Sequence, residues 1–161
     1  MTVDPNDFKA ALARFATGVT VVTFRVPDGA PTGVTVNAFN SVSLDPPLVL
    51  FCMGKAGQSH AAVVAAQSFT VNVLAADQVD LSNRFAKSGG DKFAGLEVND
   101  GTNGCPVLPG CLATLECRRE ALHDAGDHTL VIGRVVRLRY AEEGTPLLFF
   151  RSAYGRLGGP L

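Results

Sequence analysis

One segment, residues 32–48, constrains the fold of this 161-residue chain more than any other. Its apolar side chains recur at every second position and only Asn40 interrupts them: Val34, Val36, Ala38, Val42 and Leu44. Strict alternation predicts a β-strand with one buried face. The other face has amide and hydroxyl groups, one aromatic ring and no charge; it comprises Gly33, Thr35, Asn37, Phe39, Ser41 and Ser43.

A neutral polar strand face has two interpretations. Amide and hydroxyl groups suit a polar, uncharged ligand that is held by hydrogen bonds. Threonine and serine are also common on exposed strands, and the same face suits a contact with another subunit. The strand by itself leaves both interpretations open.

Composition and charge exclude several classes of protein. Hydrophobic residues make up 47% of the chain and charged residues only 18%, which favours an oligomer that buries part of this surface. The net charge is −1 and no long basic run occurs, so nucleic acid and anionic membranes are not expected partners. No apolar run reaches the ~18 to 20 residues of a membrane span. Acidic residues precede any apolar run at the N-terminus, so no signal peptide is expected. We expect one cytoplasmic domain over residues 1–161.

The four cysteines are expected to be free thiols. No C-x-x-C pair occurs, and Cys52 and Cys117 lie in apolar runs, where a small thiol fits. A zinc site from Cys105, Cys111, Cys117 and His123 lacks any known ligand spacing, so we expect no metal.

Along the chain, periodicity and turn residues predict about seven strands and three short helices. The helices are expected at residues 4–15, 60–66 (after Ser59 as cap) and 77–86. The strands are expected at residues 18–24, 32–44, 48–53, 69–74, 112–118, 128–140 and 147–150. Pro27-Asp28-Gly29 predicts a hairpin turn, and 45–47 is expected to end pairing. Residues 48–53 are uniformly apolar, which predicts a strand buried on both faces. This spacing is typical of a sandwich or barrel.

Common catalytic motifs are missing. The sequence has no G-x-S-x-G elbow and no G-x-x-x-x-G-K-[ST] phosphate loop. It also has no G-x-G-x-x-G between a strand and a helix, so a nicotinamide nucleotide would bind outside a Rossmann crevice.

Several polar residues remain as candidates. Lys55, Ser59 and free N–H groups of the following helix would form a phosphate seat, with a ring system over residues 35–39. Alone, Lys55 also fits a solvated loop, and His128 also fits a surface histidine at a barrel rim. Arg84 suits either a phosphate or Asp80 on its own helix. Tyr154 suits an aromatic lid or a packing residue.

Taken together, these segments resemble the short-chain flavin reductases, the split-barrel proteins that serve two-component monooxygenases. The resemblance covers residues 8–154. It rests on the order of FATGVTVVT, GVTVNAFNSVSLDPPLVLF, FTVNVL, RFAKSGGDKFAGL and AGDHTLVIGRV, with a late PLLFFRSAYG.

The resemblance implies a mainly β, Greek-key split barrel that forms a homodimer, with a flavin in a groove near the dimer interface. It implies hydride transfer from NADH or NADPH to FMN or FAD, and delivery of reduced flavin to a partner monooxygenase or to ferric iron. The flavin-binding residues expected are Thr35, Val36, Asn37, Ala38, Phe39, Asn40, Ser41, Cys52, Gly54, Lys55, Ser59, His60 and Arg84. Those expected near the nicotinamide are Gly33, Arg151, Tyr154 and the catalytic candidate His128. Residues 88–93 would help to close the site.

A second hypothesis belongs to another class. Split barrels also bind flavin without turnover, as electron carriers or sensors. The AGDH segment and Tyr154 favour the reductase, because only nicotinamide chemistry needs them. A structural dimer without a ligand does not account for the neutral face.

Overall fold

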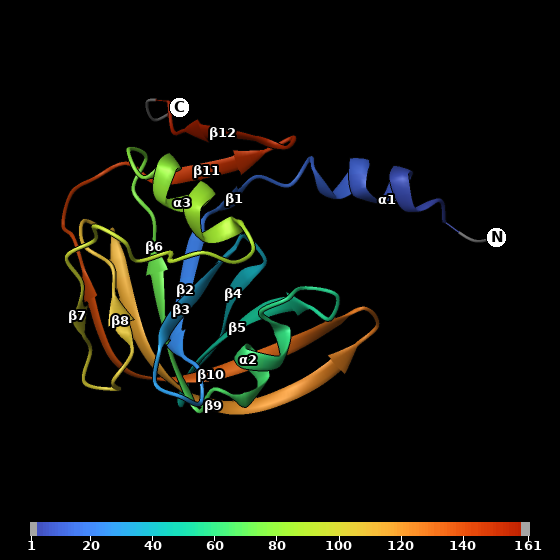
Figure 1. Cartoon of the computed structure of the whole chain (residues 1–161). Coiled ribbons are helices and arrows are strands. Elements are labelled where there is room, and N and C mark those ends of the chain that lie inside the picture. The colour runs from blue at the N-terminus through green and yellow to red at the C-terminus, as the bar shows by residue number, and fades with distance from the viewer. Residues whose placement is uncertain (1–2, 159–161) are drawn as a thin grey trace.

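The computed structural model describes residues 3–158 and is mainly β (Figure 1). Its largest sheet has seven strands, paired antiparallel throughout, in the order β3-β2-β6-β9-β10-β5-β4. Their bounds are β2 Thr20–Arg25, β3 Pro31–Val36, β4 Phe39–Leu44, β5 Pro47–Gly54, β6 Ser68–Val73, β9 Ala113–Ala125 and β10 His128–Tyr140. The predicted mainly β class is confirmed.

The remaining elements lie around this sheet. A second sheet joins β1 (Thr17–Gly18), β11 (Leu147–Phe150) and β12 (Ala153–Arg156), and β7 (Asn99–Asp100) pairs with β8 (Pro106–Val107). The three helices are α1 (Pro5–Leu12), α2 (His60–Ala65) and α3 (Val79–Ala86). None of these helices within residues 3–158 is long and apolar enough to span a membrane. The described residues hold twelve strands rather than seven. The predicted strand 32–44 is two strands, β3 and β4, and β1, β7, β8 and β12 were not predicted. Three of these, β1, β7 and β8, have only two residues each, too few for a periodic signal.

The β2–β3 hairpin forms as its turn residues predict. Gly29 adopts a φ of 88°, which is accessible to glycine without steric cost. The Asp28 carboxylate accepts a hydrogen bond from the Ala30 N–H at 2.9 Å. Strands β2 and β3 then pair in register from Thr20–Val36 to Arg25–Pro31.

The segment predicted as one ligand-face strand is two strands at opposite edges of the sheet. Strands β3 and β4 are the two end members of the sheet order, yet only residues 37 and 38 separate them. Two residues span at most about 7 Å, so the sheet must curl until its edges adjoin. The Cys52 N–H donates to the Ala38 carbonyl at 3.0 Å, which fixes this link against β5.

The predicted burial of this segment is right in β3 and wrong in β4. Val34 and Val36 are buried, whereas Val42 is 46% and Leu44 93% exposed. The pairing of β4 with β5 shifts register between Ser41 and Ser43, and β4 is an edge strand in which Asn40, Ser41, Val42 and Leu44 are exposed.

Two predictions about β5 are also wrong. Pro47 does not end pairing: it begins β5 and is opposite Leu44 in a hairpin. The run 48–53 is not buried on both faces, since only every second residue is buried. Val49, Phe51 and Met53 enter the core, while Leu50 and Cys52 point to the outer face of the curled sheet.

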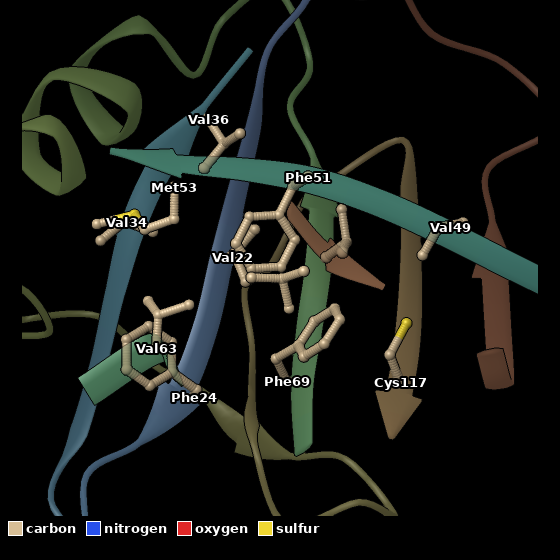
Figure 2. Close-up of a cluster of buried hydrophobic side chains, with 12 residues drawn as sticks. Val22, Phe24, Val34, Val36, Val49, Phe51, Met53, Val63, Phe69 and Cys117 are labelled. Atoms are coloured by element: carbon tan, nitrogen blue, oxygen red, sulfur yellow. The ribbon is translucent and has the colours of Figure 1, made fainter. Parts of the chain in front are cut away.

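The inner face of the sheet forms the main core (Figure 2). Phe51 of β5 and Phe69 of β6 meet edge to face, with ring centroids 5.2 Å apart. A second core lies between the sheet and α3, around Leu74, Phe85 and Leu147. The two cores together hold the sheet, α3 and the β11–β12 hairpin as one unit.

Helix α1 begins where the sequence predicts and ends earlier. The Asp4 carboxylate caps it, accepting from the N–H of Asn6 at 2.8 Å. None of its residues is buried, and the apolar side chains Phe8, Leu12 and Phe15 are 56%, 56% and 76% exposed. Figure 1 shows α1 extending away from the rest of the chain.

Glu116, in the middle of β9, is a buried carboxylate with several partners. Its Oε2 accepts from the Thr102 N–H at 2.7 Å, and its Oε1 lies 3.7 Å from an Arg139 nitrogen and 4.0 Å from Arg137. Burial by itself would raise the pKa of Glu116, but the hydrogen bonds from Thr102 and Asn103 and the charge of Arg137 outweigh it, so the pKa is lowered. This carboxylate ties the 100–105 loop to the sheet.

Replacing Glu116 with Gln is expected to destabilise the fold by about 2–3 kcal/mol at pH 7, because the arginines lose their anion. A lowered pKa in the folded state stabilises the fold above the ordinary glutamate pKa, and that contribution is lost as the pH falls through the folded pKa. The difference between wild type and Glu116→Gln should therefore shrink in acid, as measured by denaturant unfolding. Glu120→Gln, which removes an exposed partner of Arg134, is the control and should leave the unfolding midpoint almost unchanged, because solvent screens an exposed ion pair.

Candidate functional site

A groove lies between α1, residues 37–40, β5 and the β11–β12 turn. Its volume is about 530 Å³, within the ~300–1,000 Å³ of ordinary ligand sites. Its lining is Lys9, Leu12, Ala13, Phe15, Thr17, Asn37, Ala38, Phe39, Asn40, Leu50, Cys52, Phe149, Arg151 and Ser152. A smaller hollow of about 270 Å³ adjoins it along Asn37, Phe39 and Asn40.

The chemistry of this groove is specific. Its walls are mainly apolar, with Phe15, Phe39 and Phe149 as rings. The amides of Asn37 and Asn40 supply donors and acceptors, and no carboxylate is among the lining residues. The cations among the lining residues are Lys9 and Arg151. Such a groove suits a planar, mostly apolar ligand with polar edges and an anionic group.

Six of the predicted site residues meet in this groove: Asn37, Ala38, Phe39, Asn40, Cys52 and Arg151. Burial raises the pKa of the Cys52 thiol, so it is protonated at neutral pH and behaves as a small apolar group. Two neighbours lie elsewhere: Val36 belongs to the core and Ser41 is exposed on β4.

His128, the first residue of β10, lies on the outer sheet face that also lines the groove. Its partner on β5 is farther along that strand than Cys52. Directly opposed residues point to the same side of a sheet. Leu130 is opposite Cys52 and His128 is opposite Gly54, two residues or about 7 Å along β5. The imidazole lies over Gly54, where a Cβ would be 3.5 Å from Nε2 of His128. This is an ordinary van der Waals distance, so the ring lies directly against the backbone at Gly54.

The carboxylate of Asp127 orients His128. Nδ1 of His128 is 2.7 Å from Oδ1 of Asp127. The hydrogen bond from His128 and its charge lower the pKa of Asp127, so the carboxylate is ionised at neutral pH. An ionised carboxylate only accepts, so Nδ1 carries a proton, and in the uncharged form of the ring Nε2 is then the acceptor.

Lys55 and Ser59 are near His128 but do not form the predicted seat by themselves. The Lys55 ammonium is 3.2 Å from the Asp124 carboxylate, and the backbone N–H of Lys55 donates to the Asp127 carbonyl. The Ser59 hydroxyl does not cap α2, contrary to prediction. A nitrogen of His60 is 2.9 Å from the Thr129 hydroxyl, which ties α2 to β10.

The other predicted residues face α3 rather than the groove. The Thr35 hydroxyl donates to the Ser82 carbonyl at 2.6 Å. The Tyr154 hydroxyl shares a hydrogen bond of 2.9 Å with the Ser82 hydroxyl and donates to Asn83, and its ring packs on Phe149. In the single chain, Tyr154 thus packs between β11 and α3, and its part in binding a nicotinamide stays a prediction.

Gly33 and Arg84 also make their contacts around α3 and not in the groove. A Cβ at Gly33 would lie 2.9 Å from the Phe85 ring, so glycine is needed for close packing. The Gly33 carbonyl accepts from the ammonium of Lys92, a buried lysine whose pKa burial lowers. The Arg84 guanidinium donates to the Ala94 carbonyl at 3.0 Å, and neither Asp80 nor the groove is its partner.

Comparison with known proteins decides the family. The model of the flavin reductase like domain matches residues 12–158. The chain belongs to the flavin reductase family. This confirms the resemblance of the segments compared above, and it makes the chain an oxidoreductase.

Relatives of this reductase cover nearly all of it. The FMN reductase (NADH) SmoA of Agrobacterium fabrum is 51% identical over 153 residues, which are 94% of this chain and 85% of that protein. The reductase subunit HsaB of a flavin-dependent monooxygenase from Rhodococcus jostii is 43% identical over 94% of this chain and 77% of its own length. The solved structure of the Streptomyces globisporus NADH:FAD oxidoreductase SgcE6 has a TM-score of 0.91 and 36% identity, covering 100% of this chain and 99% of that one.

The groove of the reductase fits a flavin by its chemistry. Apolar walls suit the ring system, amides suit its polar edge, and cations without acids suit a phosphate. The residues that sequence reasoning missed are Lys9, Leu12, Ala13, Phe15, Thr17, Leu50, Phe149 and Ser152. The available signal for the α1 residues was the spacing of Phe8, Leu12 and Phe15 at intervals of four and three residues. Leu50 was hidden in the run expected to be buried on both faces.

Proposed function

We propose that this chain is an NAD(P)H:flavin oxidoreductase that transfers hydride from NADH or NADPH to FMN or FAD. The observation that carries the proposal is the groove itself, with apolar walls, the two amides of Asn37 and Asn40, and cations but no acid. Family membership supports the same reaction. Reduced flavin would serve a partner monooxygenase or ferric iron, and the likeness to a monooxygenase reductase subunit supports the first.

The protein's contribution is positioning. When bound, the flavin supplies the atom that accepts the hydride. Phe15, Phe39 and Phe149 exclude water from the groove, and Asn37 and Asn40 would hold the polar ring edge. These neutral side chains favour moderate affinity, which suits a flavin that leaves after reduction.

His128 is the residue that we propose for the nicotinamide. Its Nε2 is free to accept a hydrogen bond, because Nδ1 donates to Asp127. The carboxamide N–H of a nicotinamide is a suitable donor, and Nε2 is also able to hold a proton. His128 shares the outer sheet face with Cys52 of the groove, so a ligand that extends from the groove along β5 reaches it. Lys55, Ser59 and His60, which adjoin this end, would assist with a phosphate.

We also propose that two copies form a homodimer of split barrels, each chain a single cytoplasmic domain over residues 1–161. Helix α1 buries none of its residues, and isolated helices shorter than ~12–15 residues are marginal in water. A second copy that covers Phe8, Leu12 and Phe15 would stabilise α1 and enclose the groove, because Leu12 and Phe15 also line it.

The reaction is tested by NADH and NADPH oxidation at 340 nm, with and without FMN or FAD. We expect oxidation that depends on added flavin and identifies the preferred pair of nucleotides. A bound flavin spectrum without oxidation would instead support the electron carrier or sensor. The absence of both oxidation and a bound flavin spectrum would contradict the proposal altogether.

Replacing His128 with Asn is expected to lower kcat/KM for the nicotinamide nucleotide about 10- to 100-fold, the equivalent of one or two hydrogen bonds at the reacting group. Steady-state kinetics and flavin fluorescence titration separate this loss from flavin binding, which should be unchanged. His123→Asn is the matched control, since His123 is exposed on the adjoining strand opposite Leu130. Wild-type kinetics in His128→Asn would remove the role given to this residue.

Replacing Phe8 with Glu is expected to weaken the dimer at least about 30-fold, because a charge would be buried at its centre. Phe8 does not line the groove, so the change tests association alone. Light scattering coupled to gel filtration gives the mass. Asn6→Glu, which adds the same charge on the polar side of α1, should remain dimeric; a monomeric wild type would refute the dimer.

A further inference from the structure

The groove has two cations at one end that lack an acidic partner. Among the described residues, Arg25, Lys55 and Arg134 each pair with a carboxylate. The side chains of Lys9 and Arg151 line the groove and make no hydrogen bond or ion pair with any residue between positions 3 and 158. A charged groove without an internal counter-ion favours an anionic ligand.

The turn that carries Arg151 is conformationally unfavourable. Arg151 has a φ of 51° and Ser152 a φ of 62°, and they are the only non-glycine residues of the described chain with positive φ. A two-residue hairpin turn with both residues in this region prefers Asn-Gly. Strained conformations of this kind are typical of functional sites, and here both residues line the groove.

The same turn is anchored to α1. The Arg151 N–H donates to the Ala13 carbonyl at 3.0 Å, and the Ala13 N–H donates to the Lys9 carbonyl at 2.9 Å. Residues 9 and 13 are one helical turn apart and share a helix face. The backbone segments that carry the two groove-lining cations are therefore joined where α1 meets the β11–β12 turn.

We propose that Lys9 and Arg151 form a seat for a phosphate group of a bound nucleotide. This rests on the proposed function and adds a phosphate contact within the groove, apart from Lys55, which pairs with Asp124 and does not line the groove. A guanidinium matches two phosphate oxygens at once and an ammonium adds a point charge. The phosphate belongs to the flavin nucleotide or to the nicotinamide dinucleotide.

The test compares Arg151→Gln, Lys9→Gln and the double variant with wild type. Kd is measured for riboflavin, FMN and FAD by flavin fluorescence, and KM for NADH and NADPH. Each change should weaken the phosphate-bearing ligand about tenfold, the loss of one charge-assisted contact, and leave riboflavin unchanged. Added salt should reduce the difference. Arg118→Gln, an exposed arginine of β9 outside the groove, is the matched control.

The pattern of losses identifies the phosphate. Weaker binding of FMN and FAD together assigns the seat to the flavin phosphate, a loss for FAD alone to its adenylate half, and a higher KM for NADH alone to the nicotinamide dinucleotide. Unchanged Kd and KM values for every ligand would overturn the proposed seat. So would a loss of affinity for riboflavin equal to that for FMN and FAD. So would loss of the dimer in the variants, because the cations would then serve association. If the wild type binds flavin but does not oxidise NADH or NADPH, the proposed function is refuted. The phosphate seat is then still tested by the Kd values for riboflavin, FMN and FAD.

Ser152→Gly tests the turn by a readout that does not depend on a ligand. Glycine adopts positive φ readily, so the melting temperature should rise by about 2–4 °C, while FMN or FAD binds more weakly to the looser turn. A lower melting temperature would show that Ser152 is not strained and would overturn this part of the inference.

Discussion

The two-residue link between β3 and β4 is the constraint on which the rest of the structure depends. It joins the end strands of a seven-stranded sheet, so the sheet is forced to curl. The bond from the Cys52 N–H to the Ala38 carbonyl holds the link against β5. Because the link has no room for further secondary structure, its side chains and those of the first residues of β4 are presented at the surface. This is how Asn37 and Asn40 come to line the groove.

Because the sheet curls, the alternate side chains of one strand lie in two different environments, the core inside and the groove outside. On β5, Val49, Phe51 and Met53 pack in the core, while Leu50 and Cys52 line the groove on the other side. Period-two geometry thus lets one strand serve the core and the ligand at once. On the inner face Phe51 packs against Phe69 (Figure 2). This packed face supports the outer face, on which His128 also lies. A site on strands backed by a packed core is held in place without large loops.

Hydrogen bonds from the rim of the sheet complete the groove. Ser82 of α3 accepts from Thr35 and shares a bond with Tyr154, so one residue connects β3, α3 and the β11–β12 hairpin. The hairpin in turn reaches α1 through Arg151 and Ala13. Thr35 and Tyr154, which the family resemblance places near the ligands, thus also connect the elements that border the groove. Helix α1 remains without a partner in the single chain, which makes it the natural place for a second copy.

Local patterns in the sequence determined much of this protein. Turn chemistry at Asp28 and Gly29 predicted the first hairpin, alternation predicted the buried Val34 and Val36, and the order of segments identified the family. The sequence did not reveal that residues 32–48 split into strands at opposite edges, because alternation continues across the link. It did not show that Leu50 and Cys52 face a groove, since an apolar wall and a core have the same composition. Tertiary structure alone decided which polar residues meet. Pairing between distant strands, and not spacing along the chain, sets those distances.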